Sequence, residues 1–166
     1  MLEKANKIKI TNPQELNNKK FYRKVQIGLD VVVSEIFREG INIVIINRDK
    51  NYKKLYERTY NTDFNAQESE DLACLIKDTP YDRIIILTAI GRWMGKVTPN
   101  LMTEIKQIGG PDLKNLITPD NLDASQTKHS FVLIGRRGLC RYNGIFKINN
   151  YDISQDIKDL LHNLNS

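Results

Sequence analysis

Three short, almost wholly apolar runs most constrain what this chain can fold into: 41–46, 84–87 and 131–134. All three consist mainly of Ile, Val and Leu, and each is shorter than a buried helix usually is. Runs of this length and composition are typical of strands that are buried on both faces. We therefore expect them to be the central strands of a sheet.

A period of two in the hydrophobic pattern predicts further strands on either side of these runs. Between Val25 and Ile36 apolar residues recur at every second position, which favours one long strand with a single buried face. Shorter strands are expected near 8–10, as an edge strand, and over 142–148.

A similar alternation follows the second of the long strands. In 55–60, the spacing of two places Tyr56, Arg58 and Tyr60 on one face of a strand, with Leu55, Glu57 and Thr59 on the other. Because both faces carry polar groups, we expect an edge strand that borders solvent.

Helix start and stop signals surround two segments, and a third segment is amphipathic. The first helix is expected to begin near Ala66, with Asn65 as its N-cap, and to end before Pro80. The second is expected over 98–108, because a Thr-Pro pair opens it and a Gly-Gly-Pro sequence closes it. The apolar spacing over 151–166 predicts a C-terminal amphipathic helix.

The order of these elements predicts the fold class. The first strands are joined by turns that are too short for crossover helices, so they pair in antiparallel fashion. We expect an α/β fold of the α+β type, in which mixed, mostly antiparallel sheets are flanked by helices. Residues 1–166 are expected to form a single domain, because the chain has one domain's length and neither a repeat nor a linker.

The charge of the chain is mildly basic and needs to be located before it is interpreted. Lys and Arg number 25 against 20 Asp and Glu, which gives a formal charge of +5. Part of this excess reflects a composition rich in Asn, Lys and Ile, which AT-rich coding tends to produce. An extended nucleic-acid surface is therefore not favoured, and a local site for an anion or for hydroxyl groups fits better.

Targeting signals are not evident in the sequence. No apolar run reaches the roughly 18 residues that a membrane helix needs, and the first residues lack the apolar stretch of a signal peptide. The expectation is a cytoplasmic protein that does not enter a membrane. Cys74 and Cys140 are expected to be reduced thiols with a packing role, since they form at most one disulfide.

The turn Gly91–Lys96 is the first candidate binding site. It places the chain's one tryptophan, Trp93, between Arg92 and Lys96, directly after a buried strand that contains Thr88. An exposed indole ring would stack on a sugar or a base, while the two cations would bond oxygen atoms. The alternative interpretation is that Trp93 covers the edge of the core.

The turn Gly135–Gly138 is the second candidate. It carries Arg136 and Arg137, is followed by Arg141, and lies within 124–151, where there is no Asp or Glu. Backbone amides beside glycines, together with guanidinium groups, can hold a phosphate or a carboxylate. A hairpin whose charges only solubilise the protein is an equal alternative.

The two turns form one site only if their strands have the same direction. Both turns leave the C-terminal ends of expected central strands, so they converge if these strands are parallel neighbours. A further basic run over 19–24 is interpreted as a solvated approach to the first long strand.

No set of residues for catalysis or metal binding stands out. The two histidines, His129 and His162, lie far apart in the sequence, the carboxylates are scattered, and no nucleophile elbow, zinc or phosphate-loop motif occurs. We therefore expect a binding domain that is not an enzyme and that uses neither a cofactor nor a metal.

Five segments resemble, in this order and at this spacing, elements of the interleukin-like EMT inducer, or PANDER-like, domain: 38–47, 60–63, 84–89, 108–110 and 131–138. The resemblance covers about residues 25–148, and its strength lies in the ordered set rather than in any single piece.

The resemblance implies a compact β-β-α fold that serves as a secreted signal in animals and as a carbohydrate-binding stem in a glycosyltransferase, neither of them catalytic. Two features depart from the family. Its animal members have a signal peptide and paired disulfides, whereas no signal peptide is evident here and the chain has only Cys74 and Cys140. The turn after the strand that ends near Thr88 also tends to be acidic in the family, whereas Gly91–Lys96 contains no carboxylate.

Three functions remain open after these observations. The first, favoured by the resemblance, is a domain that binds a carbohydrate or glycan-like ligand over the two turns. The second is a cytosolic module that captures a phosphorylated small molecule such as a nucleotide. The third is a protein-interaction domain of a larger assembly. The sequence leaves the oligomeric state open.

Overall fold

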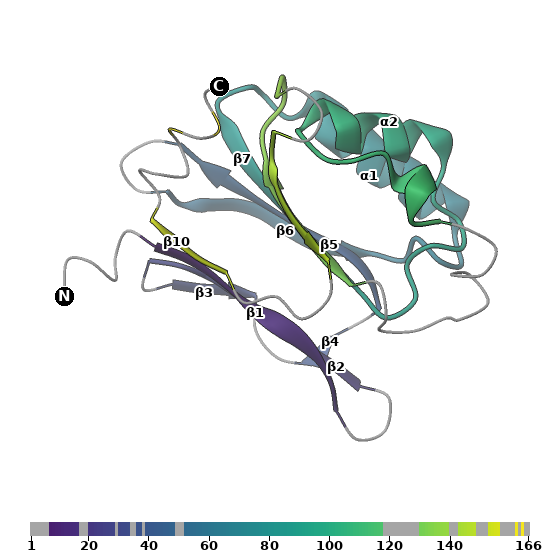
Figure 1. Cartoon of the computed structure of the whole chain (residues 1–166), viewed down its shortest axis with the longest axis horizontal. Coiled ribbons are helices and arrows are strands. Elements are labelled where there is room, and N and C mark those ends of the chain that lie inside the picture. The colour runs from purple at the N-terminus through teal and green to yellow at the C-terminus, as the bar shows by residue number, and fades with distance from the viewer. Residues whose placement is uncertain are drawn as a thin grey trace.

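The computed structural model describes residues 7–16, 20–28, 30–33, 36–37, 39–48, 52–117, 130–139, 143–148, 153–156, 162 and 164. Within these residues, two β-sheets and two α-helices are stacked in three layers, with one sheet between the helices and the other sheet (Figure 1). The expected α+β sandwich with mostly antiparallel sheets is therefore confirmed.

The middle layer, which we call the central sheet, has five strands that all pair in antiparallel fashion. Their order across the sheet is β6 (Lys54–Tyr60), β5 (Gly40–Asn47), β7 (Arg83–Ile90), β8 (Phe131–Gly135) and β9 (Ile145–Ile148).

Strands β5, β7 and β8 are buried on both faces, as their composition predicts. In β5, Ile41 and Ile43 belong to the core under the helices, whereas Val44 and Ile46 belong to the core against the other sheet. Successive side chains of a strand point to opposite faces, so a strand between two cores is mostly apolar at both its odd and its even positions. The three apolar runs are thus the centre of the molecule.

The second layer, which we call the outer sheet, also has five strands. The sheet contains β10 (Ile153–Asp156), β1 (Lys7–Leu16), β2 (Lys20–Ile27) and β3 (Asp30–Val33), in that order, with β4 (Ile36–Phe37) paired to β2. Ile8, Ile10, Val25 and Ile27 point inward and pack against the central sheet. Between them, Lys9 points outward and is exposed.

The helices begin where the sequence signals predict. Helix α1 (Ala66–Asp78) starts after Asn65, whose Oδ1 accepts a hydrogen bond from the backbone of Gln67 at 3.0 Å. Helix α2 (Pro99–Gln107) starts after Thr98 and has its proline in the first turn. Both helices cover the central sheet on the side away from the outer sheet (Figure 1).

The long strand predicted over 25–36 is wrong. Strand β2 ends at Ile27, Gly28 follows with a φ of +60°, and β3 returns beside β2 in antiparallel fashion. A period of two continues through both arms of a hairpin, so the alternation does not reveal the turn. The glycine with positive φ is the element that reverses the chain.

The C-terminal helix predicted over 151–166 is wrong for residues 153–156, whereas His162 is helical. Ile153–Asp156 is strand β10, and it pairs with β1 so that Ile153 lies opposite Ile10. Burying Ile153 in the core between the two sheets overrides the helical spacing. Residues 157–161 lie outside the described residues, as do Cys140, Arg141 and His129.

Candidate functional site

The chain's tryptophan lies in the core. The side chain of Trp93 is 1% exposed and meets the ring of Phe131 edge to face, with the ring centres 5.0 Å apart. In this structure Trp93 is not accessible for stacking on a ligand, and the alternative interpretation, that it covers the edge of the core, describes its position. Thr88 is also fully buried, whereas Arg92 and Lys96 are exposed.

The backbone of the Gly91–Lys96 turn already binds two carboxylates of the chain itself. The N–H of Arg92 donates to Glu39 Oε2, and the N–H of Gly95 donates to Asp63 Oδ1, both at 2.7 Å. The turn has no acidic residue of its own, but Glu39 and Asp63 supply the carboxylates. Its amides are therefore occupied in this structure and do not form an open anion site.

The glycines of this turn make that approach feasible. A Cβ on Gly95 would lie 2.6 Å from both the carbonyl oxygen and Oδ1 of Asp63, and one on Gly91 would lie 2.7 Å from Cγ of Glu39. Gly91 also has a φ of +65°, which side chains other than glycine rarely adopt. The glycines that made this turn look like a ligand loop thus serve contacts within the protein.

The arginines of the Gly135–Gly138 turn also have partners within the protein. Arg137 Nη1 lies 3.1 Å from Glu104 Oε2 on α2 and donates to the carbonyl of Ile76 on α1 at 3.5 Å. Arg136 Nε donates to the carbonyl of Leu164 at 2.5 Å. The two guanidinium groups hold separate parts of the chain together, while Arg141 lies outside the described residues.

The two basic turns do not converge. Strands β7 and β8 are neighbours but antiparallel, so Gly135 lies opposite Ile85 near the start of β7. The Gly91–Lys96 turn follows the other end of β7. The prediction of one site formed by both turns required parallel strands and is wrong.

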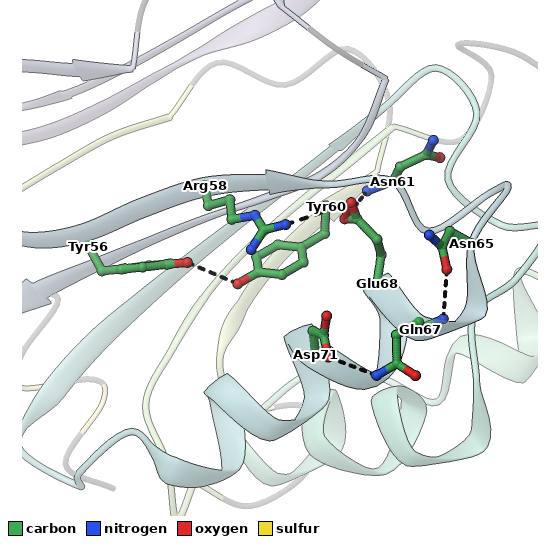
Figure 2. A network of polar contacts seen from close by, with 8 residues as sticks. All are labelled: Tyr56, Arg58, Tyr60, Asn61, Asn65, Gln67, Glu68 and Asp71. Atoms are coloured by element: carbon green, nitrogen blue, oxygen red, sulfur yellow. Dashed lines mark hydrogen bonds and ion pairs between the residues drawn. The ribbon is translucent and has the colours of Figure 1, made fainter.

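A different group of polar side chains comes together between β6 and the first half of α1. We call Tyr56, Arg58, Tyr60, Glu68 and Asp71 the β6–α1 surface. Its strand residues point toward the helix, and its acidic residues point from the helix toward the strand (Figure 2). The register of β6 on β5 confirms the predicted alternation, because Tyr56, Arg58 and Tyr60 pair with Ile45, Ile43 and Ile41, whose side chains face the helices.

Arg58 is the centre of this surface. Its side chain is 51% exposed, and its guanidinium carbon lies 4.6 Å from the centre of the Tyr60 ring. Nη2 of Arg58 is 3.8 Å from Glu68 Oε1, a separation at the long limit for an ion pair. The guanidinium is thus held in place by an aromatic ring and a carboxylate, while about half of the Arg58 side chain remains exposed to solvent.

The phenols and the helix complete the network. The hydroxyl groups of Tyr56 and Tyr60 are 3.1 Å apart and share a hydrogen bond. Glu68 Oε2 accepts from the backbone N–H of Asn61 at 3.1 Å, and Asp71 Oδ1 accepts from the side-chain amide of Gln67 at 2.9 Å. The strand, the following loop and the helix are therefore tied together by the residues that face the surface.

The electrostatics of the surface leave Arg58 charged and Tyr60 neutral at physiological pH. Burial, followed by the neighbouring Tyr56, raises the pKa of Tyr60 well above its usual 10.0, and the Arg58 cation opposes this rise only in part. The pKa of Arg58 is raised as well, chiefly by Tyr60. A permanent cation therefore lies beside a phenol that stays protonated.

The opposite face of β6 is anchored to the interior. Asn42 on β5 is 1% exposed, and its Nδ2 donates to Glu57 Oε1 at 2.5 Å and to Thr59 Oγ1 at 3.0 Å. These bonds hold β6 to β5 on the face that carries Glu57 and Thr59. They thereby fix the position of Arg58 and Tyr60 on the opposite face of the strand. The sequence pattern revealed the alternation of β6, but the acidic residues of α1 that face it are distant in sequence from Arg58.

Two further findings concern the described part of the chain as a whole. Among the described residues, no three His, Cys, Asp or Glu side chains lie close enough together to hold a metal ion. No described helix has both the length and the apolar character needed to cross a membrane.

Comparison with known proteins bears on the family of the chain. A sequence model of the interleukin-like EMT inducer family matches residues 39–139, from the glutamate that binds the Gly91–Lys96 turn to the end of the β8 turn. No curated protein sequence matches the chain. The family match covers more than half of the 166 residues. The chain therefore belongs to the interleukin-like EMT inducer family.

Proposed function

We propose that this chain is a binding domain that takes a polyhydroxylated ligand of the carbohydrate class on its β6–α1 surface. The observation that carries the proposal is the half-exposed side chain of Arg58, whose guanidinium is held over the Tyr60 ring. Glu68 lies beside the guanidinium and Asp71 lies on the helix near the Tyr60 ring, so the surface offers both donors and acceptors of hydrogen bonds (Figure 2).

The chemistry of these groups suits hydroxyl groups. A guanidinium donates several hydrogen bonds in one plane, and carboxylates accept bonds from the hydroxyl groups that the guanidinium does not reach. Arg58 is already ordered by Tyr60, so less side-chain entropy is lost when a ligand binds. A sugar, which carries both donors and acceptors on adjacent carbons, complements such a surface.

The charge of the surface favours a neutral ligand over a phosphorylated one. Arg58 supplies one positive charge, whereas Glu68 and Asp71 supply two negative charges. A phosphate next to Arg58 would also lie next to the Glu68 carboxylate, and like charges at short range are unfavourable. This supports the carbohydrate hypothesis over capture of a nucleotide at this place.

The exposed cations of the Gly91–Lys96 turn lie at the border of the same region. The N–H of Lys96 donates to the carbonyl of Thr62 at 2.8 Å, and Thr62 belongs to the loop between β6 and α1. Arg92 and Lys96 therefore remain predicted contacts for a ligand that extends beyond the β6–α1 surface, without Trp93 or the Gly135–Gly138 turn.

A glycan array followed by NMR titration of the strongest hit tests the proposal. The variant Arg58→Lys keeps the charge but loses the planar set of donors, and we expect it to weaken binding about tenfold, which corresponds to roughly 1.4 kcal/mol. Lys54→Ala removes a charge from an exposed position of the same strand and serves as the control, with affinity unchanged. Binding that is equal in wild type and Arg58→Lys, or that perturbs only amides outside β6 and α1, would contradict the proposal.

A further inference from the structure

The outward face of the outer sheet carries a second group of polar side chains that none of the above uses. On β1, Lys9 lies directly opposite Gln26 of β2 on one side and Ser154 of β10 on the other. Thr11, which follows Lys9 by two residues on β1, lies opposite Lys24 of β2. Directly opposed residues have their Cβ atoms about 5 Å apart, so these five side chains form one continuous cluster.

The sheet is hollowed at this cluster. Lys9, Thr11, Ile153 and Ser154 line an open depression of about 290 Å³. Lys9 and Ser154 are exposed, and Thr11 and Lys24 are partly exposed, so their polar groups are accessible from solvent. The volume is near the lower end for sites that bind small molecules, and it is large enough for a group of a few atoms.

We propose that this depression binds a tetrahedral oxyanion, namely the phosphate or sulfate group of a small molecule. Lysine ammonium groups are compact charges with three donors, and the hydroxyl groups of Thr11 and Ser154 add donors from two different strands. Donors that approach from several directions match a tetrahedral anion better than a planar carboxylate, which is bound best by a guanidinium fork.

The charge around the depression supports an anion. Among the described residues that lie directly opposite Lys9 and Thr11 on the neighbouring strands, none is acidic. Two residues before Lys9 on β1, Lys7 lies opposite Asp156 of β10. Asp152 precedes the strand β10 in sequence and lies outside the described residues.

This site is independent of the β6–α1 surface. It lies on the sheet that is farthest from the helices (Figure 1), and its described charges are positive, whereas those of the β6–α1 surface are negative on balance. Of the basic run over 19–24, Lys24 is the residue whose side chain the structure describes, and it lies opposite Thr11 in this cluster.

The test is an NMR titration of the ¹⁵N-labelled full chain with inorganic phosphate, sulfate and acetate at constant ionic strength. We expect phosphate and sulfate to shift the amide signals of β1 and β10 saturably, with dissociation constants on the order of 1 mM, and acetate to bind more weakly. Further titrations with adenosine 5′-monophosphate and with a sulfated monosaccharide distinguish a phosphate ester from a sulfate ester as the natural source.

Matched lysine variants distinguish phosphate binding at this depression from a general effect of the protein's positive charge. Lys9→Gln is expected to raise the dissociation constant for phosphate about fivefold, whereas Lys147→Gln removes the same charge from an exposed position on β9 and leaves it unchanged. Ser154→Ala, which leaves the charge unaltered, is expected to weaken binding by about twofold to fivefold and replaces Lys9→Gln if that variant does not fold.

Three results would overturn the proposal. The first is the lack of any saturable shift on β1 and β10 with phosphate or sulfate. The second is an equal loss of affinity in Lys9→Gln and Lys147→Gln, which indicates nonspecific screening. The third is acetate binding as strong as that of phosphate, since it removes the preference for a tetrahedral anion.

Discussion

Trp93 shows how one residue can fit a binding role by sequence and a packing role in the fold. Its neighbours Arg92 and Lys96 suggested a ligand loop, yet its ring lies against Phe131 in the core beneath the helices. The neighbours of a residue along the chain do not reveal what covers its side chain, because that depends on a strand about 40 residues further on. An exposed and a buried tryptophan therefore look alike in sequence.

Replacement of Trp93 by alanine is expected to destabilise the protein by about 3–5 kcal/mol, because it leaves a cavity in a fully packed place. Urea denaturation followed by circular dichroism measures this loss. Phe64→Ala is the control, since Phe64 is 63% exposed and its removal is expected to change the free energy of unfolding by about 0.5 kcal/mol or less. A loss below about 1 kcal/mol for Trp93→Ala would show that the ring does not contribute to the core.

The raised pKa of Tyr60 links the β6–α1 surface to pH. Its pKa in the folded protein is above the usual 10.0, so the unfolded chain loses this proton first as the pH rises. The contribution of Tyr60 to stability is therefore complete below about pH 10 and is lost progressively above it. We expect the urea midpoint to fall above about pH 10 and to fall less steeply in Tyr60→Phe, measured over pH 8–11. If the urea midpoint depends on pH equally in the wild type and in Tyr60→Phe, the pKa of Tyr60 is the same in the folded and unfolded states, which contradicts the prediction.

At the scale of elements, the sequence predicts helix starts and strand faces, because both depend on residues that are close together in the chain. The N-caps Asn65 and Thr98 bind amides two and three residues away, so their signals and their partners lie together in the sequence. The alternation of β6 was likewise visible, because a strand's two faces follow from its own backbone. Local chemistry therefore predicts where these elements begin and which way their side chains point.

The pairing of elements depends on distant residues and was harder to predict. Residues 91–130 separate β7 from β8, and no local pattern in them records that β8 pairs with β7 in antiparallel fashion. The single hairpin residue Gly28 was hidden in a continuous alternation for a related reason: the pattern is the same whether or not the chain turns. The site predicted from the Gly91–Lys96 and Gly135–Gly138 turns was wrong for the same reason. It required both turns to lie at one end of the sheet, and this depends on the direction of β8 beside β7.

Arg137 illustrates an element held by a long-range contact. It joins the turn after β8 to Glu104 on α2 and to the last turn of α1, with side-chain exposures of 21% and 13% for the ion pair. Arg137→Ala is expected to cost about 2 kcal/mol, because it leaves Glu104 partly buried and without its partner. A double-mutant cycle with Glu104→Gln measures the coupling. Additive losses in that cycle would show that the pair is not coupled, and Arg92→Ala is the exposed control.

At the scale of the whole molecule, two cores share one sheet. The central strands contribute one set of side chains to the core beneath the helices and the other set to the core against the outer sheet. A substitution in these strands therefore affects whichever core its side chain enters. The outer sheet has only one buried face, so its other face is available for polar groups such as Lys9.

The pairing of β1 with β10 makes the second core depend on both ends of the described chain. Ile10 and Ile153 lie opposite each other and are both buried. We expect Ile10→Ala and Ile153→Ala each to cost about 2–4 kcal/mol in urea denaturation, and the double variant to cost about 1 kcal/mol less than their sum, because they share one contact. Strict additivity would indicate that the two side chains do not pack together.

That pairing also sets an order of events when the protein is made. Strands β5 to β9 of the central sheet all lie between residues 40 and 148, and they can pair among themselves as they are synthesised. Strand β1 is made before them, but its partner β10 is made after them, and contacts of such long sequence separation form slowly. Strand β1 must therefore wait, with an edge unpaired, until β10 has been made.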